Sequence, residues 1–240
     1  MPWLIAPVRS VGRDADLYVD RLFSDAPSRG ATLIVAEHSR YICDLNRDID
    51  DIDAESVEGA TGADSPHGLV WHRSTDGHRV LPCPLPSHEL KRRLDEYYYP
   101  YHRAIRRLLD ERRREFGHAI LLCAHSMPSR GRLGSADVGR KRADIVPGSR
   151  GRTTAAAIVI DAAEALAKKS GWSVAHDDPY RGGFATMHYG QPNHGWHALQ
   201  IELSRARYMD EASLLPHSGF TQAQEFCSEL VTVLGSLRLR

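Results

Sequence analysis

The chain has 240 residues, of which 42% are hydrophobic and 26% are charged, a composition typical of a globular protein with a sizeable core. Basic and acidic residues both number 31, so the formal net charge is +0, which disfavours nucleic acid or an anionic membrane as a partner. No stretch approaches the roughly 20 apolar residues of a membrane helix, and no cleavable signal opens the chain. We therefore expect a cytoplasmic protein with a single domain over residues 1–240. Its oligomeric state is not indicated by the sequence.

Predicted strands alternate with predicted helices along the chain. The strands cover residues 31–36, 40–45, 118–124, 172–176 and 197–203, and the apolar run at 118–124 is typical of a central strand buried on both faces. The helices cover residues 90–116, with a kink near Pro100, 153–169, capped by Thr153 and Thr154, and 221–237, opening with a capping box. This alternation predicts an α/β fold with a sheet covered by helices on both faces.

Polar residues end three of the predicted strands, where α/β sheets gather their ligands. Asn46 and Arg47 follow one strand, and His125 and Ser126 follow another. In the strand at 197–203, Glu202 shares a face with Ala198 and Gln200, and a carboxylate inside a buried strand needs a partner. Imidazole, carboxylate and guanidinium groups together are the parts of a hydrolytic zinc site that binds an anionic substrate.

Each of these residues also has a purely structural interpretation. A histidine after a strand is often a hydrogen-bonded core or loop residue. Glu202 could pair with Arg205 or Arg207, and Asp44 or Arg47 could form a structural ion pair. No HxxE or HExxH spacing decides between these interpretations.

A set of short motifs in order resembles the N-formylglutamate amidohydrolase family, a branch of the zinc-carboxypeptidase-like hydrolases. The motifs include DLNR at 44–47, HSMP at 125–128, PYRGG at 179–183 and QIE at 200–202. Further similar segments lie at residues 14–23, 68–71, 75–77, 97–102, 144–148, 188–190 and 207–209. The resemblance covers nearly the whole chain.

The resemblance implies a three-layer mixed sheet and a zinc-dependent amidase. Such an enzyme removes the formyl group of an N-acyl amino acid such as N-formyl-L-glutamate, a late step of histidine degradation. His125 and Asp16 are similar to zinc ligands of the family, with Asp14 as the alternative to Asp16, and Glu202 is similar to its general base. The residues implied to contact the substrate are Asn46, Arg47, Ser126 and Arg181. Which N-acyl amino acid is bound is not indicated.

One family feature has no counterpart. Family members carry a Pro-His-Ser-Gly-like motif upstream of the segment equivalent to residues 14–16, and its histidine completes the zinc site. Residues 4–10 contain no histidine, and we interpret the Ser-Pro-His-Gly at 65–68 as coincidental. We expect the coding sequence to extend upstream of Met1, or residues 4–8 to fill the strand position. The alternative is a non-catalytic relative that at most binds N-acyl amino acids, because catalytic zinc normally has three protein ligands.

Overall fold

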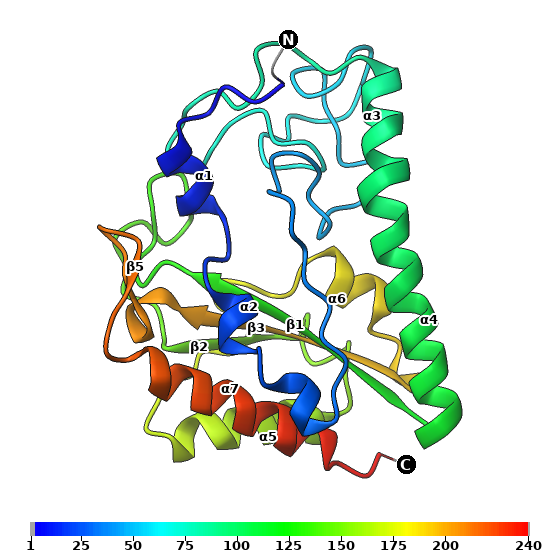
Figure 1. Cartoon of the computed structure of the whole chain (residues 1–240), viewed down its shortest axis with the longest axis vertical. Helices are drawn as coiled ribbons and strands as arrows, with labels where there is room; N and C mark the ends of the chain where they lie inside the picture. Colours follow the sequence, from blue (N-terminus) through cyan, green and yellow to red (C-terminus); the bar gives the residue numbers. More distant parts are fainter. Residues whose placement is uncertain (1–2, 240) are drawn as a thin grey trace. The chain divides into compact units, whose positions relative to one another are not determined.

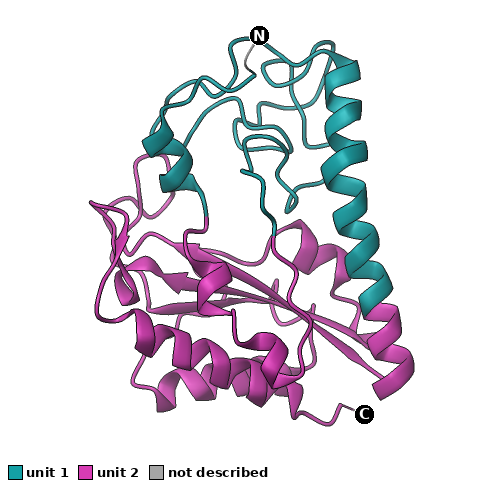
Figure 2. Cartoon of the chain, in the orientation of Figure 1, with its two compact units in different colours: residues 1–15, 36–108 teal, residues 16–35, 109–240 magenta. Residues whose placement is uncertain are grey.

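The structure is a computed structural model that describes residues 3–239. The chain divides into two compact units (Figure 2). Unit 1 comprises Met1–Ala15 and Ala36–Leu108, and unit 2 comprises Asp16–Val35 and Leu109–Arg240. The single domain predicted over residues 1–240 stays a prediction.

Unit 2 contains a three-stranded mixed sheet in the order β1-β3-β2 (Figure 1). Its strands are β1 (Ala119–Met127), β2 (Ile145–Gly148) and β3 (Trp196–Ser204). Strands β1 and β3 are parallel, and β2 is antiparallel to β3. The central strand is therefore β3, in which all nine residues are buried, and the prediction that residues 118–124 form the central strand is wrong. The α/β fold with a mixed sheet is confirmed.

The hydrophobic core of unit 2 lies on one face of this sheet. Leu199, Ile201 and Leu203 of β3 pack there against α5 (Ala157–Lys169) and α7 (Phe220–Gly235). Figure 1 shows both helices side by side along this face. Because side chains alternate along a strand, Gln200 and Glu202 leave β3 on the opposite face. That face stays available for polar chemistry.

The remaining elements of unit 2 are short. They are α2 (Val19–Leu22), η1 (Ala26–Arg29), α6 (Phe184–Tyr189), η3 (Pro192–His194), η4 (Arg205–Arg207), β4 (Met209–Asp210) and β5 (Leu215–Pro216). The capping predicted for two helices is wrong. The N-cap of α5 is Ala156, which makes no side-chain cap hydrogen bond, and Thr154 Oγ1 instead donates to the Ala198 carbonyl at 2.8 Å. Helix α7 starts after Gly219 without a side-chain cap.

Unit 1 consists largely of long loops. Its helices are α1 (Val8–Asp14), α3 (Ser87–Arg93), η2 (Leu94–Tyr98) and the first part of α4 (Tyr99–Phe116), whose residues from Leu109 on belong to unit 2. Its core contains the fully buried Tyr41, Leu69, Val70 and Leu85. The predicted helix at 90–116 is confirmed. A wider π-type turn at 94–98 directly precedes Pro100, which lacks the N–H that a regular turn would use.

Three predicted strands are wrong. Residues 31–36 have no strand partner among the described residues, and Ile34 and Val35 are exposed. Residues 40–45 form turns, because Asp44 Oδ1 accepts the Asn46 N–H at 2.9 Å and competes with strand pairing. Residues 172–176 pair with Ile145 only at Val174.

No helix within residues 3–239 is long and apolar enough to cross a membrane. The four cysteines are free thiols, and all except Cys83 are buried. Burial raises the pKa of Cys43 to about 12 and that of Cys123 to about 11. These buried thiols are therefore protonated near neutral pH.

Candidate functional site

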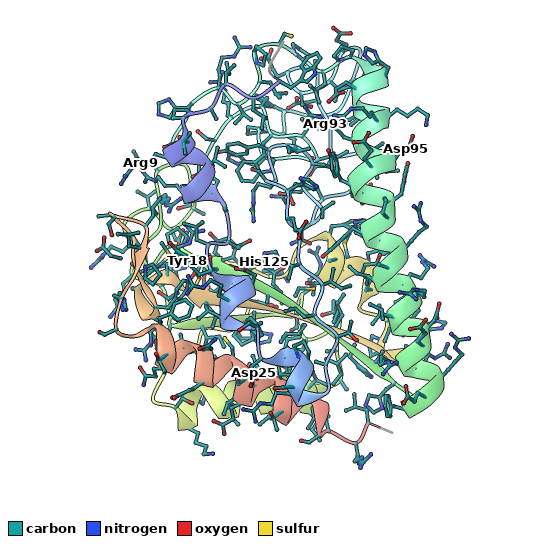
Figure 3. All side chains as sticks on the ribbon, in the orientation of Figure 1. Arg9, Tyr18, Asp25, Arg93, Asp95 and His125 are labelled. Atoms are coloured by element: carbon teal, nitrogen blue, oxygen red, sulfur yellow. The ribbon has the colours of Figure 1, made fainter. Side chains whose placement is uncertain are left out.

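The ends of β1 and β3 bring two of the predicted site residues together in unit 2. His125 and Glu202 are register partners in this parallel pair, so both side chains leave the sheet on the same face. Glu202 is buried, and His125 is partly buried. Figure 3 shows His125 at the end of β1. The sheet thus sets an imidazole beside a carboxylate.

Asp16 is the third predicted residue of this group. Its Oδ2 lies 3.0 Å from His125 Nδ1, and its Oδ1 accepts the Ser126 N–H at 2.8 Å and the Ser126 hydroxyl at 3.2 Å. The Ser126 hydroxyl in turn accepts Nε of the buried Arg205 at 3.1 Å. Asp16 is therefore oriented by Ser126 and directs its second oxygen at His125. In this geometry Ser126 positions the carboxylate.

Asp14 has a different environment in unit 1. Tyr41 donates its hydroxyl to Asp14 Oδ2 at 2.6 Å, and Thr75 donates its backbone N–H at 2.9 Å and its hydroxyl. Burial, then Asp14 itself, raises the pKa of Tyr41, so the phenol keeps its proton. These contacts favour a structural role for Asp14 and leave Asp16 as the better metal-ligand candidate.

Glu202 is held by an amide. Gln200 Nε2 donates to Glu202 Oε1 at 2.9 Å, and Gln200 Oε1 accepts the Gly183 N–H at 2.8 Å. The alternative that Glu202 pairs with Arg207 is wrong, because Arg207 pairs with Asp144: Arg207 Nη1 lies 3.8 Å from Asp144 Oδ1. A neutral amide thus fixes the direction of the carboxylate while leaving its charge uncancelled by that contact.

The PYRGG segment crosses the same face of the sheet. A Cβ at Gly148 would lie 2.7 Å from Gly182 N, so this approach requires glycine at 148. Arg142 Nη1 donates to the Tyr180 hydroxyl at 3.1 Å. Burial, followed by the Glu202 charge, raises the pKa of Tyr180. A protonated phenol therefore lies in the electrostatic field of the candidate base.

The two predicted substrate-binding arginines belong to different units. In unit 2, Arg181 is exposed, and its guanidinium forms no ion pair with any residue in 3–239. In unit 1, Arg47 Nε is buried and has no hydrogen-bond partner among the described residues. Asn46, next to Arg47, donates its N–H to Asp44, whose other oxygen accepts Trp71 Nε1 at 3.0 Å. Asp44 is therefore engaged by neutral donors rather than by Arg47.

Sequence reasoning missed one group of possible metal ligands. Asp53, Asp64 and His72 of unit 1 bring donor atoms within 4.8 Å of one another. Asp53 Oδ2 lies 3.1 Å from His72 Nε2 and accepts the Ser65 N–H at 2.7 Å. These residues come from one long loop and show no ligand spacing that could have indicated the group.

The structure is that of an α/β protein in which β1 and β3 of unit 2 bring an imidazole and carboxylates together. The N-formylglutamate amidohydrolase family model matches residues 4–209. An N-formylglutamate deformylase of Pseudomonas aeruginosa is 34% identical over 204 residues, covering 82% of this chain and 72% of the relative. One of Pseudomonas putida is 31% identical over 240 residues, covering 98% and 83%.

Solved structures agree with these sequence relatives. The crystal structure of an N-formylglutamate amidohydrolase from Ralstonia eutropha matches with a TM-score of 0.85 at 28% identity, covering 96% of this chain and 85% of that one. A gene product from Agrobacterium tumefaciens matches with a TM-score of 0.63 at 22% identity, covering 93% and 78%, and supports the fold alone. The chain belongs to the N-formylglutamate amidohydrolase family, which confirms the resemblance found in its motifs.

Proposed function

We propose that this protein hydrolyses the N-formyl amide of N-formyl-L-glutamate, or of a close N-acyl amino acid, to release formate. The names of the Pseudomonas relatives and of the Ralstonia structure support this reaction. The enzyme is thus a hydrolase of linear amides that acts on a small molecule.

Arg47 and Arg181 bind the carboxylates of the substrate. The guanidinium of Arg181 and the Nε of Arg47 have no hydrogen-bond or ion-pair partner among the described residues, and planar guanidinium groups bind carboxylates in a bidentate manner. Asn46 precedes Arg47 and is a further candidate contact. Two carboxylates distinguish N-formylglutamate from N-acyl derivatives of neutral amino acids, so these arginines favour an acidic substrate.

Asp16 and His125 have the donor chemistry of a zinc site. An imidazole nitrogen and a carboxylate oxygen converge at 3.0 Å, and Ser126 orients the carboxylate as residues behind metal ligands commonly do. We therefore assign Asp16 and His125 as the residues that would hold zinc. When bound, zinc supplies Lewis-acid polarisation of the acyl carbonyl and lowers the pKa of water.

Glu202 acts as the general base and then as the general acid. Its carboxylate accepts a proton from the attacking water and returns that proton to the amide nitrogen as the C–N bond breaks. Gln200 fixes the direction of the carboxylate. The products are formate and the free amino acid.

The alignment of His125 with Glu202, with Asp16 beside His125, is the observation that carries this proposal. The test is release of formate and glutamate from N-formylglutamate by purified protein with added zinc. Turnover that depends on Glu202 supports the proposal. Absence of turnover, or full turnover by Glu202→Gln, contradicts it.

A second candidate is a non-catalytic relative that binds N-acyl amino acids. It is favoured by one observation: within the described residues, no group of three ligand-type side chains includes Asp16 and His125. Elemental analysis separates the two functions. Near-stoichiometric zinc on Asp16 and His125 supports the enzyme, whereas metal-free protein that binds N-formylglutamate without turnover supports the relative.

Two finer features rest on family membership: the sheet is the centre of a three-layer, zinc-carboxypeptidase-like fold, and the reaction belongs to histidine degradation. The cytoplasmic location is proposed from the sequence alone.

A further inference from the structure

Arg150 lies directly beside Arg181 in unit 2. The Arg150 N–H donates to the Arg181 carbonyl at 2.8 Å, and Arg150 Nη1 donates to the Gly182 carbonyl at 3.0 Å. In return, Arg181 Nη2 lies 3.9 Å from the position that a Cβ on Gly151 would take. Each guanidinium therefore lies against the glycine that follows the other arginine, and the two positive charges are on adjoining loops.

Neither of these two charges has an acidic partner. Both arginines are exposed, and neither guanidinium forms an ion pair with any residue in 3–239. Arg152 of the same loop differs, because it pairs with Asp161. The Gly182 carbonyl engages one N–H group of the Arg150 guanidinium, so most of its donors stay available for a ligand. Two neighbouring cations without a counter-ion repel each other and fit an anionic ligand.

The backbone of Arg150 is held in an unfavourable conformation. Its φ is 52°, in the left-handed region that residues with a side chain rarely adopt. The carboxylate of Asp177 stabilises this conformation, because it accepts the N–H groups on either side of Arg150, from Ser149 at 2.7 Å and from Gly151. Residues in such conformations are concentrated at functional sites. Because Arg150 is exposed, core packing does not require the conformation.

The same segment is linked to the candidate base. Gly183, which follows Gly182, donates its N–H to Gln200 Oε1 at 2.8 Å. The Gln200 amide in turn donates to Glu202 Oε1 at 2.9 Å. Residues 182–183 therefore contact the Arg150 guanidinium on one side and the amide that holds Glu202 on the other. All of these residues belong to unit 2, so the site requires no contact between the units.

We propose that Arg150 is a specificity-determining residue, which binds a carboxylate of the substrate together with Arg181. This assignment rests on the proposed function. It adds that two guanidinium groups, and not Arg181 alone, select an acidic amino acid. N-formyl-L-glutamate carries an α-carboxylate and a side-chain carboxylate, and a pair of guanidinium groups fits either one. The test identifies which of the two is bound.

The test compares three substrates of nearly equal size. N-formyl-L-glutamate has both carboxylates, N-formyl-L-glutamine has a neutral amide in its side chain, and N-formyl-L-isoglutamine has a neutral amide in place of the α-carboxylate. Formate release gives kcat/KM of each substrate for the parent protein, Arg150→Gln and Arg150→Lys. The matched control is Arg152→Gln, which removes a charge of the same loop that already has an acidic partner.

We expect Arg150→Gln to lower kcat/KM for N-formyl-L-glutamate roughly tenfold, mainly through KM, because a charge-assisted contact is lost. The same variant should leave one of the two amides unaffected, namely the amide that lacks the carboxylate bound by Arg150. Arg150→Lys keeps the charge without the planar fork and should restore part of the loss. Arg152→Gln should change none of the three values. An equal loss with all three substrates, or no loss with any, would overturn the proposal.

A double variant separates direct binding from positioning of Arg181. If Arg150 only held the loop of Arg181, Arg150→Gln would cause no further loss once Arg181→Gln is present. We expect the double variant to have a lower kcat/KM for N-formyl-L-glutamate than either single variant. A double variant equal to Arg181→Gln would overturn direct binding by Arg150.

Affinity keeps this test separate from the proposed reaction. If the parent protein releases no formate, the proposed function fails, and calorimetry then measures binding of the same three compounds. Tighter binding of N-formyl-L-glutamate than of one amide, with a difference that disappears in Arg150→Gln, still supports the carboxylate site. Absence of binding, equal affinities of all three compounds for the parent protein, or a preference that Arg150→Gln keeps, would contradict it.

Discussion

His125 and Glu202 are direct partners in the parallel register of β1 and β3. Strands that run parallel end at the same edge, so residues 77 positions apart in sequence leave one face of the sheet together. Neither side chain needs a loop to bring it there. A site built on paired strands is rigid, which suits acid–base chemistry that depends on geometry.

Substitution of the candidate base tests this arrangement most directly. Glu202→Gln keeps the shape and loses the proton acceptor, so we expect kcat to fall roughly 10²- to 10⁴-fold with little change in KM. Steady-state assay of formate release measures both constants. Glu225→Gln on α7, an exposed carboxylate, is the control and should be unaffected. An equal loss in both variants would point to general destabilisation.

Asp14 and Asp16 make a matched pair for the metal site. Asp16→Asn should lower the zinc content of the purified protein, because Asp16 faces His125 Nδ1. Asp14→Asn should keep zinc but lower the free energy of unfolding by about 1–3 kcal/mol, because Asp14 accepts the buried Tyr41 hydroxyl. Elemental analysis and denaturant unfolding are applied to both. The opposite pattern would make Asp14 the ligand.

Much of unit 2 could be predicted from the sequence. The apolar runs around residues 118–124 and 197–203 predicted β1 and β3, and alternation in β3 correctly put Gln200 and Glu202 on one face. The motifs of the family indicated Asp16 and His125 as a pair, and the structure brings their side chains within 3.0 Å. Local pattern was sufficient because both strands are regular and β3 is buried along its whole length.

Unit 1 was predicted less well for a physical reason. At residues 40–45 the β-rich composition indicated a strand, but Asp44 uses its side chain to hold turns and the Trp71 ring. Such side-chain contacts depend on residues distant in sequence, and the hydrophobic periodicity of a segment does not predict them. The amide partner of Glu202 was missed likewise, since an arginine is the usual expectation for a buried carboxylate.

Arg181 provides a test of substrate recognition. Arg181→Gln removes a guanidinium that has no ion pair among residues 3–239, so folding should be unaffected. We expect KM for N-formylglutamate to rise roughly 10- to 100-fold with a smaller change in kcat, because a charge-assisted contact to carboxylate is lost. The exposed Arg238→Gln is the control. Unchanged KM in Arg181→Gln would remove this residue from the binding site.

The acid sensitivity of unit 1 depends on Glu89 of α3. Arg92 first, and then Arg93, lower the pKa of Glu89 to about 2 from its ordinary value of 4.5. Arg93 also donates to the Ile42 carbonyl at 2.8 Å, which ties α3 to the segment before Asn46. Because the pKa of Glu89 is lower in the folded state than in the unfolded chain, Glu89 of the unfolded chain binds a proton at a higher pH. The stabilisation is complete above about pH 4.5 and is lost between about pH 4.5 and 2.

Glu89→Gln should therefore flatten the loss of stability over that pH range. We also expect it to lower the free energy of unfolding at pH 7 by roughly 1–3 kcal/mol, a value reduced for the solvent exposure of Arg92. Denaturant unfolding across the pH series measures both effects. Asp95→Asn is the control, since the exposed Lys91–Asp95 pair should contribute little. Parallel pH profiles for Glu89→Gln and the parent protein would contradict the assignment.

We expect the group formed by Asp53, Asp64 and His72 to stabilise the loop by hydrogen bonds and not to bind zinc. Both Asp53 oxygens already accept backbone N–H groups, from Ser56 at 2.8 Å and from Ser65 at 2.7 Å, so a metal ion would have to compete with them. Asp53→Ala should lower the free energy of unfolding by about 2–4 kcal/mol, because it leaves several buried donors unpaired. Asp64→Ala should change it by less than about 0.5 kcal/mol, because Asp64 is 85% exposed. Thermal unfolding with and without zinc completes the test: a zinc-dependent rise in Tm that Asp64→Ala abolishes would show that these three residues bind the ion.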